Sequence, residues 1–218
     1  MNRQLLKEKA KKILFNREFY LKLALFVFVI LVMGLYAPLN KPRFPLHFFQ
    51  TPIDDYIPLL PFFIVFYLFI HNILLYGTMA FSFAKENKRF YTLFYSLILA
   101  NLIAYVVYYF FQSTVIRPPV TGQTIFSLGV AKIYASNFLY NAFPSGHAYH
   151  STIILTHWLK SNAKKSWKII VSVLIAAVLL STLFLKQHYV LDVIAGITLG
   201  SISYILVFSL LSKKKKKK

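Results

Sequence analysis

Two histidines stand where apolar segments of the chain begin, and one of them has a carboxylate four residues further on. His147 follows Pro144-Ser145-Gly146, and His188 precedes Asp192 by four positions. Residues four apart share a helix face, so Asp192 can orient the His188 imidazole. A histidine held in this way keeps one ring nitrogen free to act as a base or a nucleophile. The second histidine can then donate a proton to a leaving group.

The residues around His147 suit an anion. Ser145 and Gly146 stand at an expected helix start, where unpaired N–H groups and the positive end of the dipole favour phosphate. Arg117 adds a planar guanidinium that can contact two phosphate oxygens at once. Together these residues indicate phosphoryl transfer, and we expect neither a metal site nor another cofactor.

Composition points to lipid as the solvent of this chain. Of its 218 residues, 58% are hydrophobic and only 14% are charged. The apolar residues come in long blocks, which is typical of membrane spans. The net charge of +19 would suggest nucleic acid in a soluble protein, but here the basic residues flank the apolar blocks. We therefore expect no nucleic-acid partner, and the lack of cysteine excludes thiolate sites.

Six apolar blocks approach the ~20 residues that cross a bilayer as a helix. Because helices satisfy their own backbone hydrogen bonds in lipid, we predict an all-α integral membrane protein, a bundle of six transmembrane helices. The expected spans are residues 20–37, 57–83, 90–112, 144–160, 167–185 and 188–211. Segments 38–56 and 113–143 are expected to be irregular loops. His71, midway along the second span, is expected to hydrogen-bond between helices.

One membrane domain is expected, over residues 20–212, with the chemistry in region 113–200. Residues 1–19 precede it, and their apolar spacing suits an amphipathic helix on an anionic membrane face. A solvated basic tail explains the same residues equally well. Residues 213–218 are all lysine and are expected to contact anionic lipids or to set topology.

The distribution of positive charge predicts the orientation in the membrane. Five of the 25 lysine and arginine residues fall on one side of the expected spans: Lys41, Arg43, Arg117, Lys132 and Lys186. The remaining twenty fall on the other side, which is therefore expected to be cytoplasmic. Both termini lie on that side. Arg117, His147 and His188 then gather on the extracytoplasmic or lumenal side.

These residues resemble the motifs of the type 2 phosphatidic acid phosphatase (PAP2) superfamily of membrane lipid phosphatases and phosphotransferases. Arg117-Pro118 is similar to the end of its first motif, and Pro144-Ser145-Gly146-His147 to its whole second motif. Ser181, His188 and Asp192 are similar to its third motif at the expected spacing. The resemblance covers about residues 113–200, and six membrane helices agree with it.

The resemblance implies a role for each residue. His188 would be the nucleophile that forms a phosphohistidine, and Asp192 would orient it. His147 would protonate the leaving oxygen and then activate water or an acceptor alcohol. Arg117, Ser145 and Gly146 would hold the phosphate oxygens. The implied activity is hydrolysis of a lipid phosphate or diphosphate, of the phosphatidate or prenyl diphosphate type.

Two positions depart from the family pattern. Phe110 stands where the first motif has a lysine, and Thr182 stands where the third motif has an arginine. Lys186 and Lys132 are candidate replacements for these cations. The same losses occur in the branch resembling inositol phosphorylceramide synthases, to which the segment from Asp54 to Pro61 is also similar.

That branch keeps two alternatives open. The first is a phosphotransferase that moves a phospho-headgroup to a second lipid alcohol. Asp54 and Asp55 would then contact the acceptor, although solvation of a loop explains them equally well. The second is a lipid-binding or carrier protein that kept the fold and lost catalysis.

Overall fold

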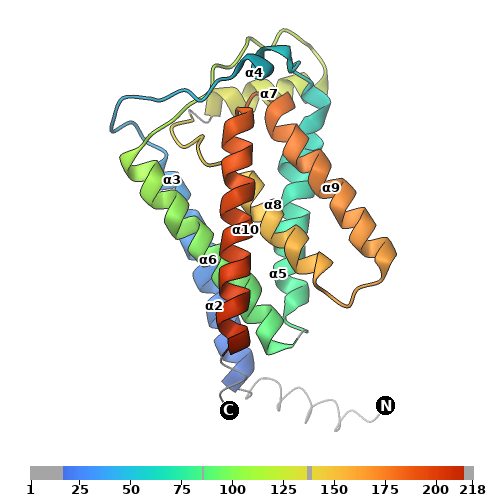
Figure 1. Cartoon of the computed structure of the whole chain (residues 1–218). Helices are drawn as coiled ribbons and strands as arrows, with labels where there is room; N and C mark the ends of the chain where they lie inside the picture. The colour runs from blue at the N-terminus through green and yellow to red at the C-terminus, as the bar shows by residue number, and fades with distance from the viewer. Residues whose placement is uncertain (1–16, 85, 137–138, 214–218) are drawn as a thin grey trace.

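The computed structural model describes residues 17–84, 86–136 and 139–213, and these form a helical bundle (Figure 1). The long elements are α2 (Arg17–Gly34), α5 (His71–Ser82), α6 (Asn87–Phe110), α7 (Ile125–Ser136), α8 (Gly146–Leu159), α9 (Lys165–Phe184) and α10 (Val190–Lys213). The short ones are α3 (Tyr36–Leu39), α4 (Pro52–Tyr56), η1 (Pro61–Phe63) and η2 (Val65–Ile70). Residues 1–16 and 214–218, which hold most of the expected basic segment and of the lysine tail, lie outside the described residues.

Five helical stretches in the described residues are long and apolar enough to cross a membrane. They are Arg17–Leu39, Pro61–Ser82, Asn87–Phe110, Lys165–Phe184 and Val190–Lys213. Each matches an expected span to within a few residues. The protein is therefore a multi-pass membrane protein with an all-helical fold.

The expected span 144–160 differs from the other five. Its helix α8 begins only at Gly146 and has 14 residues, or about 21 Å at 1.5 Å per residue. That is shorter than the ~30 Å hydrocarbon core, so the expected count of six full-length spans is not confirmed. In Figure 1, α8 begins inside the bundle, below the level of α4 and α7. We call the end with α4 and α7 the upper end; α10 ends at the lower end.

The chain reaches the start of α8 through extended backbone held by other segments. The N–H of Ala142 donates to the Ser113 carbonyl at 3.1 Å, and the N–H of Phe143 donates to the Ser113 hydroxyl at 2.7 Å. The N–H of Ser145 donates to the Asp192 carbonyl at 2.9 Å. Non-helical backbone is tolerated at membrane depth only when protein groups satisfy it in this way.

The prediction that 113–143 is irregular throughout was wrong, because helix α7 lies within it. The Thr124 hydroxyl accepts a hydrogen bond from the N–H of Ser127 at 3.1 Å and so caps the helix start. Val130 is buried beside Ile64 and Leu185. A short apolar helix between proline-rich and polar residues gives a weak sequence signal, and its stability comes from this packing.

Helices α8 and α10 approach each other closely because α10 presents two glycines four residues apart. A Cβ on Gly196 would lie 2.6 Å from the Ser145 carbonyl oxygen. A Cβ on Gly200 would lie 2.6 Å from the Tyr149 carbonyl oxygen. Small residues at this spacing let helix backbones meet in membranes. The contact sets the start of α8 against the start of α10, and this is where the expected catalytic residues lie.

Candidate active site

His188 and Asp192 lie at the upper start of α10, although only Asp192 is part of the helix. The helix begins at Val190, so His188 stands just before it rather than on its face as expected. His188 Nδ1 and Asp192 Oδ2 are 3.6 Å apart, and the two side chains are 5% and 0% exposed. The N–H of Tyr189 donates to Asp192 Oδ2 at 2.8 Å, which holds the carboxylate in place.

One buried polar atom of His188 and one of Asp192 lack a hydrogen bond. Within the described part of the chain, neither His188 Nδ1 nor Asp192 Oδ1 has a hydrogen-bond partner. Buried polar groups in this state are uncommon, and a catalytic role is one explanation for them. A small closure of the 3.6 Å separation would direct the Nδ1 proton to Asp192. His188 Nε2 is then the nitrogen available for chemistry.

His147 lies opposite, in the first turn of α8. Ser145 caps this helix, since its hydroxyl accepts a hydrogen bond from the N–H of Ala148 at 3.3 Å. The centroid of the His147 ring is 6.4 Å from that of His188. It is 4.1 Å from the Tyr67 ring and 4.3 Å from the His71 ring. The two expected catalytic histidines therefore lie near each other at the starts of two different helices.

Ser145 and Gly146 join the two helix starts. The Ser145 N–H donates to the backbone carbonyl of Asp192, so the second motif is tied directly to the third. A Cβ on Gly146 would meet Tyr149 Oη at 3.7 Å and Tyr108 Oη at 3.8 Å, which are ordinary contacts. Protein packing therefore does not require glycine at position 146. Close approach of a ligand to the backbone is a separate reason for it.

Arg117 reaches the same place from the loop after α6. Its Nη2 donates to the side-chain Oε1 of Gln187 at 2.7 Å, and Gln187 adjoins His188 in the chain. The guanidinium carbon lies 4.8 Å from the centroid of the Tyr134 ring on α7. Burial lowers the pKa of Arg117, and Tyr67 and Tyr134 oppose that shift. Arginine nevertheless stays protonated at neutral pH, so a cation is held at Gln187, the residue before His188.

Gln187 and Tyr134 were not expected in this site. Both are uncharged and neither belongs to a recognised motif, so the sequence offers only the adjacency of Gln187 to His188 as a signal. Gln187 is buried and accepts the guanidinium hydrogen bond. Its position explains how a loop arginine is held beside a helix start.

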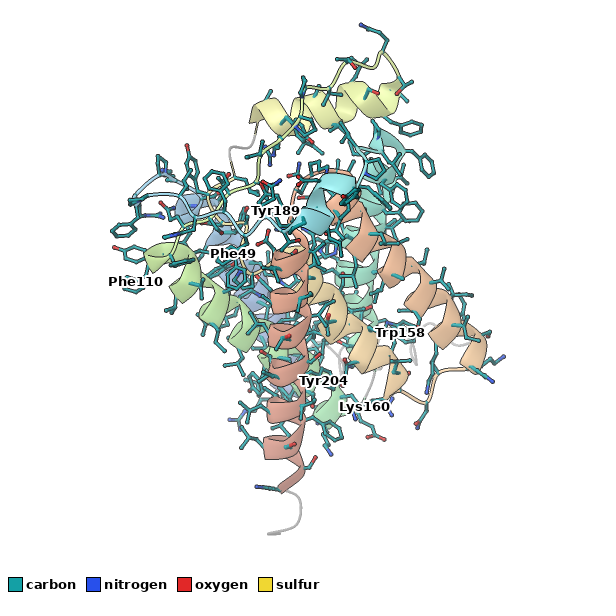
Figure 2. All side chains as sticks on the ribbon, turned by 45° about the horizontal axis from the view of Figure 1, so that its top comes forward. Phe49, Phe110, Trp158, Lys160, Tyr189 and Tyr204 are labelled. Carbon is teal, nitrogen blue, oxygen red and sulfur yellow. The ribbon has the colours of Figure 1, made fainter. Side chains whose placement is uncertain are left out.

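The two departures from the family pattern lie in different environments. Phe110 ends α6 with 68% of its surface exposed, and in Figure 2 it points away from Tyr189 at the start of α10. Thr182 is fully buried, and its hydroxyl donates to the Leu179 carbonyl within its own helix at 2.7 Å. Neither side chain offers a charge to the site.

The candidate replacement cations differ from each other as well. Lys132 lies on the exposed face of α7. Lys186 has a left-handed backbone with φ of 47°, and its amine donates to the carbonyl oxygen of Asp54 at 2.8 Å. Lys186 thus ties the α4 segment to the turn before His188.

Asp54 is engaged by the protein itself. Its Oδ1 accepts the N–H of Val190 at 2.9 Å, which caps α10, and its Oδ2 accepts both the N–H and the hydroxyl of Thr51. Asp55 accepts from the Gln50 amide at 2.6 Å. In the ranges 17–84, 86–136 and 139–213, no three histidine or carboxylate side chains gather closely enough to hold a metal ion.

Comparisons with known proteins bear on the fold and the family of the chain. A solved structure, LpxE of Aquifex aeolicus, is similar with a TM-score of 0.52 and 19% sequence identity, covering 81% of this chain and 94% of that one. No curated protein sequence matches the chain. The family model of the PAP2 superfamily matches residues 89–216, a segment that contains Arg117, His147, His188 and Asp192. The chain matches this model over more than half of its length and belongs to the PAP2 superfamily.

Proposed function

We propose that this protein is a membrane phosphatase that hydrolyses a lipid phosphate or diphosphate, of the phosphatidate or prenyl diphosphate type, through a phosphohistidine. The observation that carries the proposal is the meeting of Arg117, His147 and the His188–Asp192 pair at the starts of two closely packed helices. Family membership supports the reaction class. The lipid is the partner, and no cofactor takes part.

In the first step, the lone pair of His188 Nε2 attacks phosphorus, and the bond from phosphorus to the lipid oxygen breaks. The electrons of that bond go to the lipid oxygen, which takes a proton from the His147 imidazolium. As the 3.6 Å separation closes, Asp192 accepts the proton-bearing Nδ1 of His188 as a hydrogen-bond donor and stabilises the positive charge that forms on the ring. The products are phosphohistidine and a lipid alcohol from a monophosphate, or phosphohistidine and a lipid monophosphate from a diphosphate.

In the second step, neutral His147 takes a proton from water, and the resulting hydroxide attacks phosphorus. The phosphorus–nitrogen bond breaks, its electrons return to His188 Nε2, and inorganic phosphate leaves. Throughout, Arg117 and the N–H groups at the start of α8 stabilise the charge on the non-bridging oxygens. The negative charge of the transition state is thus stabilised by a cation and N–H groups that are already held in position.

We propose that the upper end of the bundle faces the extracytoplasmic or lumenal side. The excess of lysine and arginine at the lower end and in the terminal segments supports this orientation. Both termini would then be cytoplasmic, and their basic residues would contact anionic lipids.

Phosphate release from phosphatidate and from a prenyl diphosphate, measured in detergent with a chelator present, tests the proposal. We expect turnover by the unaltered protein, loss in both His188→Ala and His147→Ala, and an acid-labile, base-stable phosphoprotein that depends on His188. Full activity of the His188→Ala protein would exclude the mechanism. Lipid binding without any turnover or phosphoprotein would favour the carrier alternative.

A phosphotransferase is the second candidate, because Phe110 and Thr182 replace two cations of the phosphatase pattern. The capping contacts of Asp54 weaken the argument that it binds an acceptor headgroup. Adding diacylglycerol, ceramide or a polyprenol to the assay separates the two activities. Turnover that needs an acceptor, with no free phosphate, would identify the transferase.

A further inference from the structure

A π-helical turn interrupts the second membrane span directly above His71. Residues Val65–Ile70 form it, between the short η1 and the regular helix α5. π-Helical turns are rare and recur at functional sites, because they change which side chains share a face. Here the turn carries Tyr67, and His71 follows four residues later at its end. With the wider π geometry, both side chains project from the same side of the span.

Both side chains contact the ring of His147. The Tyr67 and His147 rings are stacked, with centroids 4.1 Å apart and planes 20° apart. The His71 ring lies 4.3 Å from His147 at an interplanar angle of 42°. Aromatic pairs at these separations have preferred orientations, so they restrict the rotation of the ring between χ states.

The two contacting rings are themselves held in place. Tyr67 is buried in a cluster with Ile64, Val130 and Leu185. His71 is 5% exposed, and its Nδ1 lies 3.4 Å from the hydroxyl of Ser151 on α8. This contact confirms the expectation that His71 bonds between helices. A fixed partner can impose an orientation on His147, whereas a mobile one could not.

We propose that Tyr67 and His71 form a ring clamp that positions the His147 imidazole for proton transfer to the leaving oxygen. The proposal rests on the proposed function, in which His147 is the acid. Tyr67 and His71 are positioning residues, since they act through the His147 ring. Their aromatic surface is what matters, so other flat rings of similar size can replace them.

The clamp predicts a defect that depends on the leaving group. An alkoxide needs a proton as it departs, whereas a nitrophenolate departs without one. The value of kcat/KM reports the steps up to cleavage of the bond to the leaving oxygen. Misplacing the acid should therefore lower kcat/KM for a long-chain alkyl phosphate far more than for a nitrophenyl phosphate with the same chain. General destabilisation of the protein would lower both values equally.

The experiment compares ring-removing variants with ring-keeping ones. For His71→Ala and Tyr67→Leu, we expect kcat/KM on the alkyl phosphate to fall about 10- to 100-fold, with a fall of under about 3-fold on the nitrophenyl phosphate. His71→Phe and Tyr67→Phe should stay within about 3-fold of the unaltered protein on both. His157→Ala removes a buried histidine from the other end of α8 and serves as the control. Thermal unfolding in detergent checks that each variant is folded.

The outcomes distinguish failure of the ring-clamp proposal from failure of the proposed phosphatase function. If His188→Ala is inactive but the ring-removing variants equal the unaltered protein, the clamp is overturned and the phosphatase stands. If the phenylalanine variants lose as much as the alanine and leucine variants, ring contact is not the cause, and the clamp is again overturned. If the unaltered protein cleaves neither phosphate, the proposed function itself fails.

A second measurement reports the geometry without turnover. In protein with labelled histidine, ring currents from Tyr67 and His71 should shift the His147 ring protons upfield. His71→Ala and Tyr67→Leu should move those signals towards their unstacked positions, while His157→Ala should leave them unchanged. Signals that do not move in either ring-removing variant would contradict the clamp.

Discussion

Helix α8 carries a histidine near each end, half-buried His147 and buried His157, and the two have very different surroundings. His147, at the upper end, faces the His188 ring and contacts Tyr67 and His71. His157, at the lower end, lines a cavity of about 760 Å³ together with Arg89 and other residues. The remaining lining residues described include Thr78, Phe81, Trp158, Ser161, Asn162, Lys164 and Trp167.

The comparison teaches that the proposed active end is distinguished by the convergence of chemical groups, and not by hollow space. Arg89 at the lower end is engaged with the Lys160 carbonyl and the Asn162 side chain, both at 3.1 Å. Arg117 at the upper end is bonded to Gln187, which adjoins His188 and its buried partner Asp192. Trp158 and Lys160 mark the lower end in Figure 2.

Removing the proposed nucleophile, His188, should give the largest effect. We expect His188→Ala to lower kcat by at least about 10⁴-fold, as in other enzymes that lose a nucleophile. The measurement is phosphate release from phosphatidate by purified protein. His157→Ala at the lower end should retain full activity. Equal losses of kcat in His188→Ala and His157→Ala would contradict the assignment of the active site to the upper end.

Removing the acid should have the next largest effect. We expect His147→Ala to lower kcat/KM on an alkyl phosphate by about 10²- to 10⁴-fold, the usual contribution of a general acid or base. Because attack by His188 does not require His147, phosphohistidine should still form from a nitrophenyl phosphate. A variant that forms none from that substrate would assign His147 a different role.

Substitutions of Arg117 at the upper end and Arg89 at the lower end compare the importance of positive charge at the two ends. Loss of a preorganised cation facing the phosphate should lower kcat/KM by about 10²-fold in Arg117→Ala. Arg117→Lys should recover only part of this, since an ammonium cannot make the forked contact. Arg89→Ala at the lower end should stay within about 2-fold of the unaltered protein. Comparable losses at Arg117 and Arg89 would contradict the assignment.

The smallest effect concerns how α8 meets α10. A Cβ in Gly196→Ala would press on the Ser145 carbonyl and on Ala148 Cβ, at 2.6 and 2.7 Å. We expect a loss of about 1–3 kcal/mol in stability, from overpacking, and a roughly 10-fold fall in kcat as the two helix starts shift apart. Gly77→Ala, where nothing lies within 4 Å, is the matched control in another helix. Thermal unfolding and phosphate release give both quantities.

The sequence by itself determined the features that depend on near neighbours. Apolar blocks of membrane length became helices, because a helix satisfies its backbone groups within its own segment. His188 and Asp192 are close neighbours in the chain and meet across the start of α10, although His188 is not on the helix face that the four-residue spacing predicted. The position of Ser145 before an apolar segment was enough to make it a helix cap. These contacts need no information from the rest of the chain.

Only the tertiary structure decided the features that join distant segments. Helix α7 exists because Val130 packs on Ile64 and Leu185, and α8 is short because its approach is held by Ser113 and Asp192. Asp54 became a cap for α10 although 136 residues separate it from Val190. Such contacts depend on how whole helices pack, and local periodicity carries no information about that packing.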